Sequence, residues 1–394
     1  ENGREPDPTE VEEIKAFTLS NVRGTVQADQ LKEAMGQNTL VFNLDTSLRM
    51  MGDVAEFYVN NSIRNHYFVS ISGYHIAEAG ANPITQAALT LANGLTYVEL
   101  FKARGLNPDK FLRNFSWFFS NGMDPEYVVI GRVARRIWSI AMREMYNVGE
   151  RGQKLKYHIQ SSGRSLHAQE YTWNDYRTTL QALYALADNA NSLHTNSRDE
   201  AFGTPTEETV RDAVAIQLIL SKEYGLLQNE NPLQGSHITT WLTENVEGQI
   251  LKIFEEMNRR GGVLGSLEVN YQRNRIQDES MIYEHRKHTG DIPIIGVNTF
   301  QDPDSKSLSA DEADSFDLDV TRSDGDEKRM VILRNEDFRK RHAKEAEIGI
   351  ERLKNTAREG GNLFEVMMDI VEYCTVGQVT EALFETGGQF RRNM

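Results

Sequence analysis

YFVSISGYHIAEAG, residues 67–80, contains the pattern that decides the fold. Its first part, Tyr67–Ser72, is a short apolar run of the kind that forms a buried strand. Gly73 ends the run, Tyr74 and His75 follow side by side, and Glu78 comes within one turn. A long amphipathic helical pattern begins after that. The stretch therefore predicts a strand, a turn and a helix, with polar side chains at the carboxyl end of the strand.

The same alternation of strand and helix patterns extends in both directions from this stretch. Further strands are predicted at TLVFNL (39–44), FSWFFS (115–120), LKYHIQSSG (155–163) and SLHTN (192–196). Helical periodicity covers 48–61, 82–106, 124–146, 173–188, 204–226 and 239–259. Strands that alternate with helices in this way form βα units, so the pattern predicts a parallel sheet.

The fold class that we expect is α/β, and the architecture is a (β/α)8 TIM barrel. No glycine-rich G-x-G-x-x-G turn follows a predicted strand, which disfavours a dinucleotide-binding sheet. A complete barrel needs about 250 residues, and only about five βα units are visible, the first almost at the chain start. We therefore expect this chain to carry only the later strands of a barrel.

The composition of the chain predicts four segments. Residues 1–15 are charged and rich in proline, which indicates a linker, and residues 16–300 hold the barrel pattern. Residues 301–330 are acidic, rich in Ser and Asp and poor in apolar residues, so we expect a second linker there. Residues 331–394 regain helical periodicity and predict a small C-terminal helical module.

The charge and the cysteine content exclude several classes of function. The formal net charge is −15 and the pI is about 5.2, which argues against nucleic acid or an anionic membrane as the main partner. No run of about 18 apolar residues is present to span a bilayer. The chain has 1 cysteine, Cys374, so no internal disulfide can form and we expect a cytoplasmic location.

The polar residues that follow predicted strands are the candidates for a site, because parallel barrels place their reacting groups at the carboxyl ends of strands. They are Gln27 after NVRGTV, Tyr74 and His75, His158 and Gln160, and His194 and Asn196, with Gln37 close to the same rim. No HxH pair, carboxylate cluster or lysine ends a strand, which disfavours a metal hydrolase and Schiff-base chemistry. Neutral hydrogen-bonding groups and histidines suit a site that binds a polar substrate and leaves difficult chemistry to a cofactor. On spacing alone, His75 could be a base, a ligand or a packing residue.

Four blocks of the sequence resemble, in the same order, the substrate barrel of adenosylcobalamin-dependent acyl-CoA mutases, the methylmalonyl-CoA mutase group. They are GTVQADQLKEAMGQNT (24–39), SISGYHIAEAG (70–80), HIQSSGRSLHAQE (158–170) and SLHTNSRDEAFGTPT (192–206). The resemblance runs from Gly24 to Phe300 and is weaker outside this range. It implies an isomerase that rearranges a carbon skeleton by radical chemistry, in which the thioester group migrates to the neighbouring carbon.

The resemblance also implies roles for individual residues. His75 would hydrogen-bond the thioester carbonyl, where a donor stabilises developing charge or spin, and Tyr74 would line the cavity beside it. The remaining substrate contacts implied are Thr25, Gln27, Gln37, Ser116 and His158. The cofactor contacts implied are Glu78, Gln160, Asn196 and Glu200, of which Asn196 and Glu200 would contact the adenosyl ribose. Glu78 could instead orient groups at the rim or cap the helix that follows.

Gln37 indicates which substrate the site accepts. Methylmalonyl-CoA mutases have an arginine here that pairs with the free carboxylate of the substrate, and a neutral amide fits a substrate without that carboxylate. The sequence is therefore more similar to fused isobutyryl-CoA mutases, with 2-hydroxyisobutyryl-CoA or methylmalonyl-CoA mutase as alternatives. Arg164 and Asn114 also depart from the methylmalonyl pattern. An alternative of another class is a catalytically silent barrel that acts as an assembly partner.

The resemblance implies partners outside this chain. The D-x-H-x-x-G motif that ligates cobalt is absent from the sequence, so adenosylcobalamin would be ligated by a cobalamin domain that is a separate subunit or lies upstream. Fused isobutyryl-CoA mutases also have a GTPase domain ahead of the barrel. No P-loop occurs here, so GTP and Mg²⁺ would bind only to such an upstream domain. A homodimer is expected by analogy with the group.

Overall fold

The computed structural model describes residues 7–303 and 323–391, and its strands are all parallel. β1 pairs with β2, and a second sheet has the order β3-β4-β5-β6. Only Phe68 separates β2 from β3, and backbone bonds such as Ser70 N to Ala28 O (3.4 Å) tie the segment after β1 to β3. The strands are β1 (Arg23–Thr25), β2 (Asn65–Tyr67), β3 (Val69–Ser72), β4 (Phe115–Asn121), β5 (Tyr157–Ser161) and β6 (Ser192–His194). Four of the five expected strands (67–72, 115–120, 155–163 and 192–196) are therefore present in sequential order, and β1 lies in NVRGTV (21–26).

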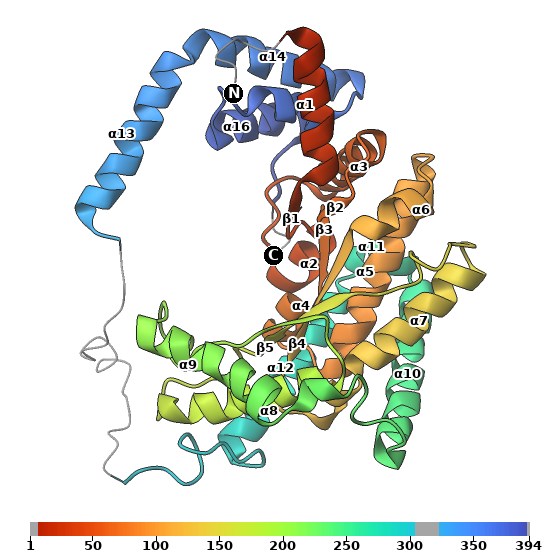
Figure 1. Cartoon of the computed structure of the whole chain (residues 1–394), viewed down its shortest axis with the longest axis vertical. Coiled ribbons are helices and arrows are strands. Elements are labelled where there is room, and N and C mark those ends of the chain that lie inside the picture. The colour runs from red at the N-terminus through yellow and green to blue at the C-terminus, as the bar shows by residue number, and fades with distance from the viewer. Residues whose placement is uncertain (1–6, 304–322, 392–394) are drawn as a thin grey trace.

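Helices connect the strands and cover one side of the sheet (Figure 1). The connecting helices are α3 (Leu44–Asn60), α5 (Pro83–Ala103), α7 (Ile130–Glu144) and α8 (Asn174–Ala187). After β6 come α9 (Glu207–Leu218), α10 (His237–Asn258), α11 (Gly262–Glu268) and α12 (Tyr271–Thr289). Short elements at the strand ends are α2 (Gln30–Lys32), the π-helix η1 (Glu33–Gln37), α4 (Tyr74–Glu78), α6 (Pro108–Phe111), η2 (Leu112–Asn114) and η3 (Pro125–Val128). Beyond them lie η4 (Tyr171–Trp173), the π-helix η5 (Ile219–Glu223) and η6 (Leu226–Gln228).

Local sequence explains where the long helices begin. The side chain of Asn82 accepts a hydrogen bond from Thr85 N (2.9 Å) and Pro83 occupies the first turn of α5. Thr206 caps α9 in the same way, because its side chain accepts a hydrogen bond from Thr209 N. Gly261, with φ of 86°, stands between α10 and α11 in the left-handed region that favours glycine.

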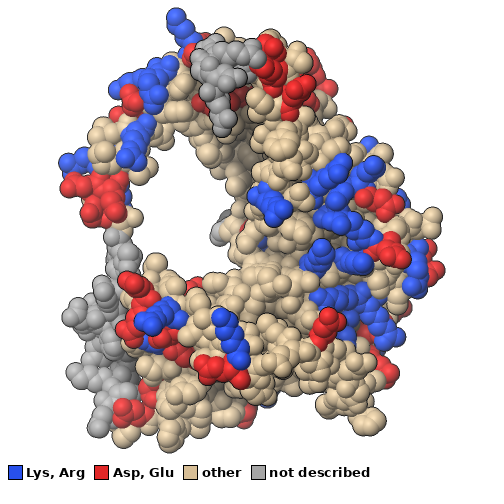
Figure 2. All heavy atoms as spheres, viewed as in Figure 1, with Lys and Arg blue, Asp and Glu red and all other residues tan. Residues whose placement is uncertain are grey.

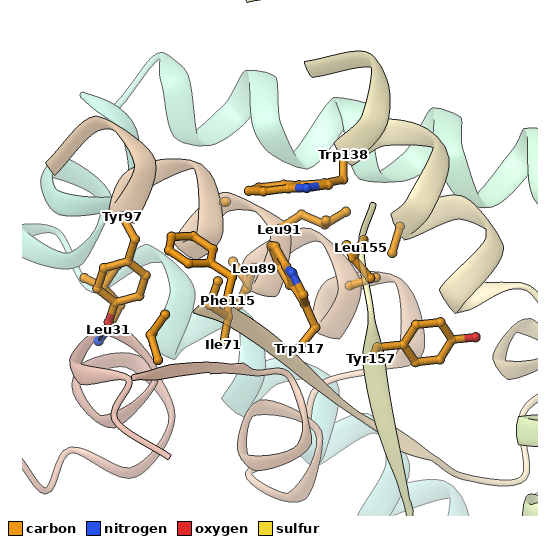
Figure 3. Packing of buried hydrophobic residues seen from close by; sticks show 14 of the residues in the cluster. Leu31, Ile71, Leu89, Leu91, Tyr97, Phe115, Trp117, Trp138, Leu155 and Tyr157 are labelled. Atoms are coloured by element: carbon orange, nitrogen blue, oxygen red, sulfur yellow. Dashed lines mark hydrogen bonds between the residues drawn. The ribbon is translucent and has the colours of Figure 1, made fainter. Parts of the chain in front are cut away.

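The two faces of the sheet differ in chemistry because successive side chains along a strand point to opposite faces. The face toward the helices is large and apolar, and Figure 3 shows Trp117 of β4 and Trp138 of α7 directed toward one another, with ring centroids 4.7 Å apart. The opposite face has hydroxyl, imidazole and amide side chains in register, together with the phenyl ring of Phe118. They are Ser70, Ser72, Ser116, Phe118, Ser120, His158, Gln160, Ser192 and His194.

Both expected linkers are shorter than predicted, because a helix begins within each of the two segments. Residues 1–15 do not form a linker throughout, because α1 (Pro8–Asn21) begins in this segment under a capping box from Asp7 and Glu10. The acidic linker expected over 301–330 ends earlier, since α13 (Gly325–Arg341) begins at Gly325 behind a second capping box from Asp324. Residues 304–322 of that linker lie outside the described residues.

The C-terminal helices pack together and onto α3. The helices α14 (Ala343–Glu359), α15 (Leu363–Ile370) and α16 (Val376–Gly387) share an apolar cluster that includes Cys374. Asp53 of α3 accepts hydrogen bonds from Arg104 Nη1 (2.7 Å) and from the backbone N–H of Leu363 (3.0 Å) at the start of α15. Residues 331–391 thus contain the rest of α13 and the helices α14, α15 and α16, and the division of the chain into modules stays a prediction.

The sheet differs from the expected pattern at TLVFNL and is open at both ends within the described residues. TLVFNL (39–44) is not a strand: the described backbone is irregular up to α3, and Phe42 forms only an isolated bridge with Gln389. Among the described residues, β6 has no strand partner other than β5, and β1 none other than β2. The α/β class with parallel strands is therefore confirmed, and closure into a barrel stays a prediction.

Candidate functional site

Gly73 places the Tyr74–His75 pair at the carboxyl edge of the sheet. Its N–H donates to the Phe118 carbonyl (2.7 Å) at the end of β3, and α4 begins at the next residue. A Cβ on Gly73 would lie 2.4 Å from Thr90 Oγ1 and 2.8 Å from Gln86 Cγ on α5, which no real side chain tolerates. The glycine therefore permits the close approach of strand and helix that turns Tyr74 and His75 onto the polar face.

His75 is a neutral imidazole that is held from its Nδ1 side. Its Nδ1 lies 2.7 Å from Ser72 Oγ, and its ring meets the Phe118 ring edge-on with centroids 6.0 Å apart. Burial, and then the charge of Lys32, lower the pKa of His75 to about 4. Because it is neutral near pH 7, His75 can act as a hydrogen-bond donor without carrying a charge.

Tyr74, Gln160 and Asn196 come together from the ends of three different strands. The Tyr74 ring stacks on Phe118, with centroids 5.0 Å apart and planes 4° apart. Gln160 Nε2 donates to Tyr74 Oη (3.0 Å) and to Asn196 Oδ1 (2.9 Å), and Asn196 Nδ2 donates to the Ser161 carbonyl (2.8 Å). Burial, followed by the charge of Glu78, raises the pKa of Tyr74, so its hydroxyl stays protonated. The structure thus brings these predicted site residues into one network.

Glu78 supports the loop after β5. Its Oε1 accepts from Ser162 Oγ (3.0 Å) and Gly163 N (3.1 Å), and its Oε2 accepts from Arg164 N (2.7 Å). Burial raises the pKa of the Glu78 carboxyl, while these donors act in the opposite direction. With both oxygens engaged, Glu78 positions the loop whose Gly163 lies against Tyr74 and Asn196.

Gln27 and Gln37 reach this edge from the segment after β1. Lys32, almost fully buried, directs its Nζ to the Gln27 carbonyl (3.5 Å) and lies near enough to His75 to lower its pKa. A Cβ on Gly36 would lie 3.6 Å from the His75 carbonyl oxygen, so the chain runs beside α4 immediately before Gln37. The side chains of Gln27 and Gln37 are both exposed.

The other predicted residues lie farther along the polar face. His158 Nδ1 is 2.8 Å from Ser192 Oγ, and burial, followed by the charge of His194, lowers its pKa to about 4. Ser116 pairs with Ser70 in the register of β4 and β3, and Thr25 ends β1 with an exposed side chain. Glu200 is exposed beyond β6, near enough to Tyr74 to raise its pKa.

A cationic hollow at the amino edge of the sheet was not predicted from the sequence. It measures about 390 Å³ and is lined by Tyr67, Leu112, Arg113, Phe115, Glu150, Arg151, Lys154 and Lys156. Burial, and then the charges of Arg151 and Arg64, lower the pKa of Arg113, as expected of crowded cations. Figure 2 shows Lys and Arg gathered on this side of the molecule, over α6 and α7. These cations come from separate segments of an acidic chain, so composition hides them.

Neither a metal site nor a membrane-spanning helix is found in the part of the chain that the structure describes. No group of three or more His, Cys, Asp or Glu side chains is arranged to hold a metal ion in residues 7–303 or 323–391. Within the same ranges, every helix is too short or too polar to cross a bilayer.

Polar groups gathered at the carboxyl edge of consecutive βα units are the arrangement in which parallel α/β enzymes bind substrate. Fold and site therefore have the layout of a substrate-binding domain of the parallel α/β class. Comparison with known families places it within that class: the chain belongs to the methylmalonyl-CoA mutase family, whose model matches residues 9–389. The members of this family are acyl-CoA mutases, which are isomerases.

Several curated relatives are similar to the chain over its whole length. The fused isobutyryl-CoA mutase of Geobacillus kaustophilus (strain HTA426) is 59% identical over 394 residues, and that of Nocardia farcinica (strain IFM 10152) is 58% identical over 392 residues. Each match covers 100% of this chain and 36% of the relative, so the chain spans about a third of their length. The 2-hydroxyisobutanoyl-CoA mutase large subunit of Aquincola tertiaricarbonis is 32% identical over 384 residues, covering 96% of this chain and 66% of that subunit.

Proposed function

We propose that this chain is the acyl-CoA-binding portion of a mutase that interconverts isobutyryl-CoA and n-butyryl-CoA. The observation that carries the proposal is identity of 56–59% over essentially the whole chain to relatives named fused isobutyryl-CoA mutase. Identity to the relative named 2-hydroxyisobutanoyl-CoA mutase large subunit is 32%, and to the human methylmalonyl-CoA mutase it is 33%. Gln37, a neutral amide beside α4, suits an acyl group without a free carboxylate.

The substrate is proposed to lie along the polar face of the sheet. Interiors of TIM barrels are ordinarily filled by bulky branched side chains, whereas this face has serines at positions such as Ser70 and Ser116, which leave space. The cationic hollow at the amino edge suits the phosphates of coenzyme A. β4 has 7 residues, which at about 3.3 Å each separate the two edges by about 20 Å. A long ligand with an anionic end and an acyl end matches this layout.

At the carboxyl edge, His75 and Tyr74 act on the acyl end of the ligand. We assign to His75 the donation of a hydrogen bond to the thioester carbonyl, which stabilises charge or spin that develops on this oxygen as the group migrates. The Tyr74 ring, fixed between Phe118 and Gln160, forms a wall that restricts how the acyl group lies. A wall that is already rigid before binding limits side reactions of reactive intermediates.

The polar network beside Tyr74 fits the adenosyl end of adenosylcobalamin, the cofactor that enzymes of this family use. The Glu200 carboxylate is exposed. The side-chain oxygen of Gln160, Oε1, has no protein partner within the described residues. Both groups can therefore accept hydrogen bonds from ribose hydroxyls. Asn196 is fixed between them by Ser161. When bound, the cofactor supplies the radical that removes a substrate hydrogen. A cobalamin-binding domain outside the described residues is proposed to ligate the cobalt, and a homodimer stays a prediction.

Substitution of Gln37 and of His75 in the complete mutase tests the proposal. Gln37→Arg places a guanidinium beside an acyl group that offers no carboxylate, so kcat/KM for isobutyryl-CoA is expected to fall at least about tenfold. His75→Ala is expected to lower kcat by about 10²–10³ while the affinity for coenzyme A is retained. The measurements are anaerobic turnover with adenosylcobalamin and titration of coenzyme A.

Gln228→Arg, an exposed glutamine in η6, is the matched control and should leave turnover unchanged. Turnover of isobutyryl-CoA that is unaffected by both Gln37→Arg and His75→Ala would sink the residue assignments. A wild-type enzyme that turns over 2-hydroxyisobutyryl-CoA or methylmalonyl-CoA in preference would contradict the proposed substrate.

A further inference from the structure

Ser72 and His75 form an isolated pair at the end of β3. Ser72 is fully buried, and its Oγ has one hydrogen-bond partner within the described residues, His75 Nδ1 at 2.7 Å. The histidine ring is partly exposed toward the polar face and contacts Phe118 edge-on. The other ring nitrogen of His75, Nε2, has no partner in the described part of the chain.

The burial of Ser72 decides which of the two groups donates. If His75 donated from Nδ1, the buried Ser72 hydroxyl hydrogen would have no acceptor, which costs free energy comparable to a lost hydrogen bond. If the Ser72 hydroxyl donates to Nδ1, both buried groups of the pair are satisfied, and the proton of the neutral ring resides on Nε2, the nitrogen on the partly exposed side. The second arrangement is the one that the contacts support.

A buried carboxylate fixes the strand end from which Ser72 acts. Asp29, which is 1% exposed, accepts a hydrogen bond from the Ser72 backbone N–H (3.0 Å) with its Oδ2. Its Oδ1 accepts from Tyr97 Oη (2.7 Å) on α5 and from Lys32 N (3.2 Å). The segment after β1, the end of β3 and α5 thus meet at one carboxylate, so Ser72 cannot shift without breaking contacts to both neighbours.

Burial and the charge of Lys32 keep the His75 ring neutral, and only a neutral ring has two alternative tautomers. Doubly protonated imidazole would donate from both nitrogens and need no tautomer. Burial and the Lys32 charge lower the pKa of His75 to about 4, so the ring is neutral at the pH at which an enzyme of this kind works. A neutral ring has one N–H, and its position decides whether His75 can donate toward the polar face.

We propose that Ser72 is a positioning residue that holds His75 in the Nε2–H tautomer and thereby presents this N–H to the thioester carbonyl. The assignment of the carbonyl as recipient rests on the proposed function, whereas the tautomer itself rests on the contacts of Ser72. Asp29 acts one step farther away, by holding the Ser72 backbone in place.

The tautomer can be observed directly by ¹⁵N NMR of the full chain labelled with ¹⁵N-histidine, with His75→Gln identifying the His75 signals. Wild-type protein at pH 7 should show a pyridine-like Nδ1 and a pyrrole-like Nε2. In Ser72→Ala both signals should move toward the average of the two tautomers, because the donor to Nδ1 is gone. Ser70→Ala is the matched control, since this serine is equally buried on the same face of β3 and has no bond to His75.

Turnover in the complete mutase supplies the functional arm. Ser72→Ala should lower kcat about tenfold with KM unchanged, the effect of losing one well-oriented hydrogen bond, and Gln228→Arg, the exposed control in η6, should change neither. A pyrrole-like Nδ1 in wild-type protein, or an unaltered His75 spectrum in Ser72→Ala, overturns the inference even if the enzyme is an isobutyryl-CoA mutase. The expected NMR result without turnover of isobutyryl-CoA would instead reject the proposed function and leave the tautomer standing.

Discussion

At the scale of single residues, His75 and His158 on the polar face share one property, which is that the fold keeps both rings neutral. His75 and His158 each pair with a serine hydroxyl through Nδ1, and burial is the largest cause of the low pKa of both rings. The sequence places His75 directly after one predicted strand and His158 within another. It contains no information on their serine partners, because Ser72 and Ser192 meet the two rings through a turn and through strand register, respectively.

His158 makes this neutrality testable through stability. Its pKa is about 4 in the folded chain and about 6.5 when exposed, so between these values the unfolded state binds the extra proton and stability falls as the pH falls. His158→Gln removes the group, so the variant should lose less stability than wild type between pH 6.5 and pH 4. The two should run parallel above pH 7. Urea denaturation at a series of pH values measures this difference, and parallel curves at every pH would contradict the low pKa.

At the scale of elements, helices and strands were predictable where the apolar pattern was long or repeated. The strands at 67–72, 115–120 and 155–163 and the helix after each are present, with boundaries that moved by a few residues. The prediction of a strand at TLVFNL (39–44) was wrong, because Phe42 of this stretch packs against a segment far away in the sequence. Phe42 packs edge-on against Phe384 of α16, with centroids 5.4 Å apart, and Leu40 is buried outside any sheet. A contact across more than three hundred positions leaves no local periodicity to read.

Asp53 joins α3 to the C-terminal helices and should be important for stability. Asp53→Asn keeps the shape of the side chain but places an amide N–H₂ against Arg104 or the Leu363 N–H, so we expect a loss of about 2 kcal/mol in the free energy of unfolding. Asp369→Asn is the control, because its ion pair with Arg352 lies on the surface and such pairs contribute less than about 1 kcal/mol. Equal effects of the two substitutions, measured by urea denaturation, would show that Asp53 is not an anchor.

At the scale of the whole molecule, positive side chains gather at one place although the chain as a whole is acidic. The chain has a net charge of −15, yet four cations line one hollow at the amino edge of the sheet. The overall charge disfavours nucleic acid as a partner, which stays a prediction, and it could not locate this local reversal of sign. The order of the chain segments did predict which residues would share the carboxyl edge, because all parallel strands end on the same side.

The hollow gives a prediction for the complete mutase. Replacing both exposed lysines, Lys154→Ala with Lys156→Ala, should raise KM for the acyl-CoA about five- to tenfold and leave kcat unchanged, because phosphate contacts affect binding more than the reacting end. The increase of KM with salt should also become shallower. Lys328→Ala with Lys340→Ala, on the exposed helix α13, is the control pair. An unchanged KM in the hollow variant would remove phosphate binding from this site.

The sequential order of the strands has a consequence for how the chain folds. From β1 to β6, each strand position pairs with the one synthesised just before it, so no strand must wait for a partner made much later. The sheet can therefore grow on the ribosome one βα unit at a time. The exception is α15, whose anchor on α3 was made about three hundred residues earlier, and its docking is the late, long-range step of assembly.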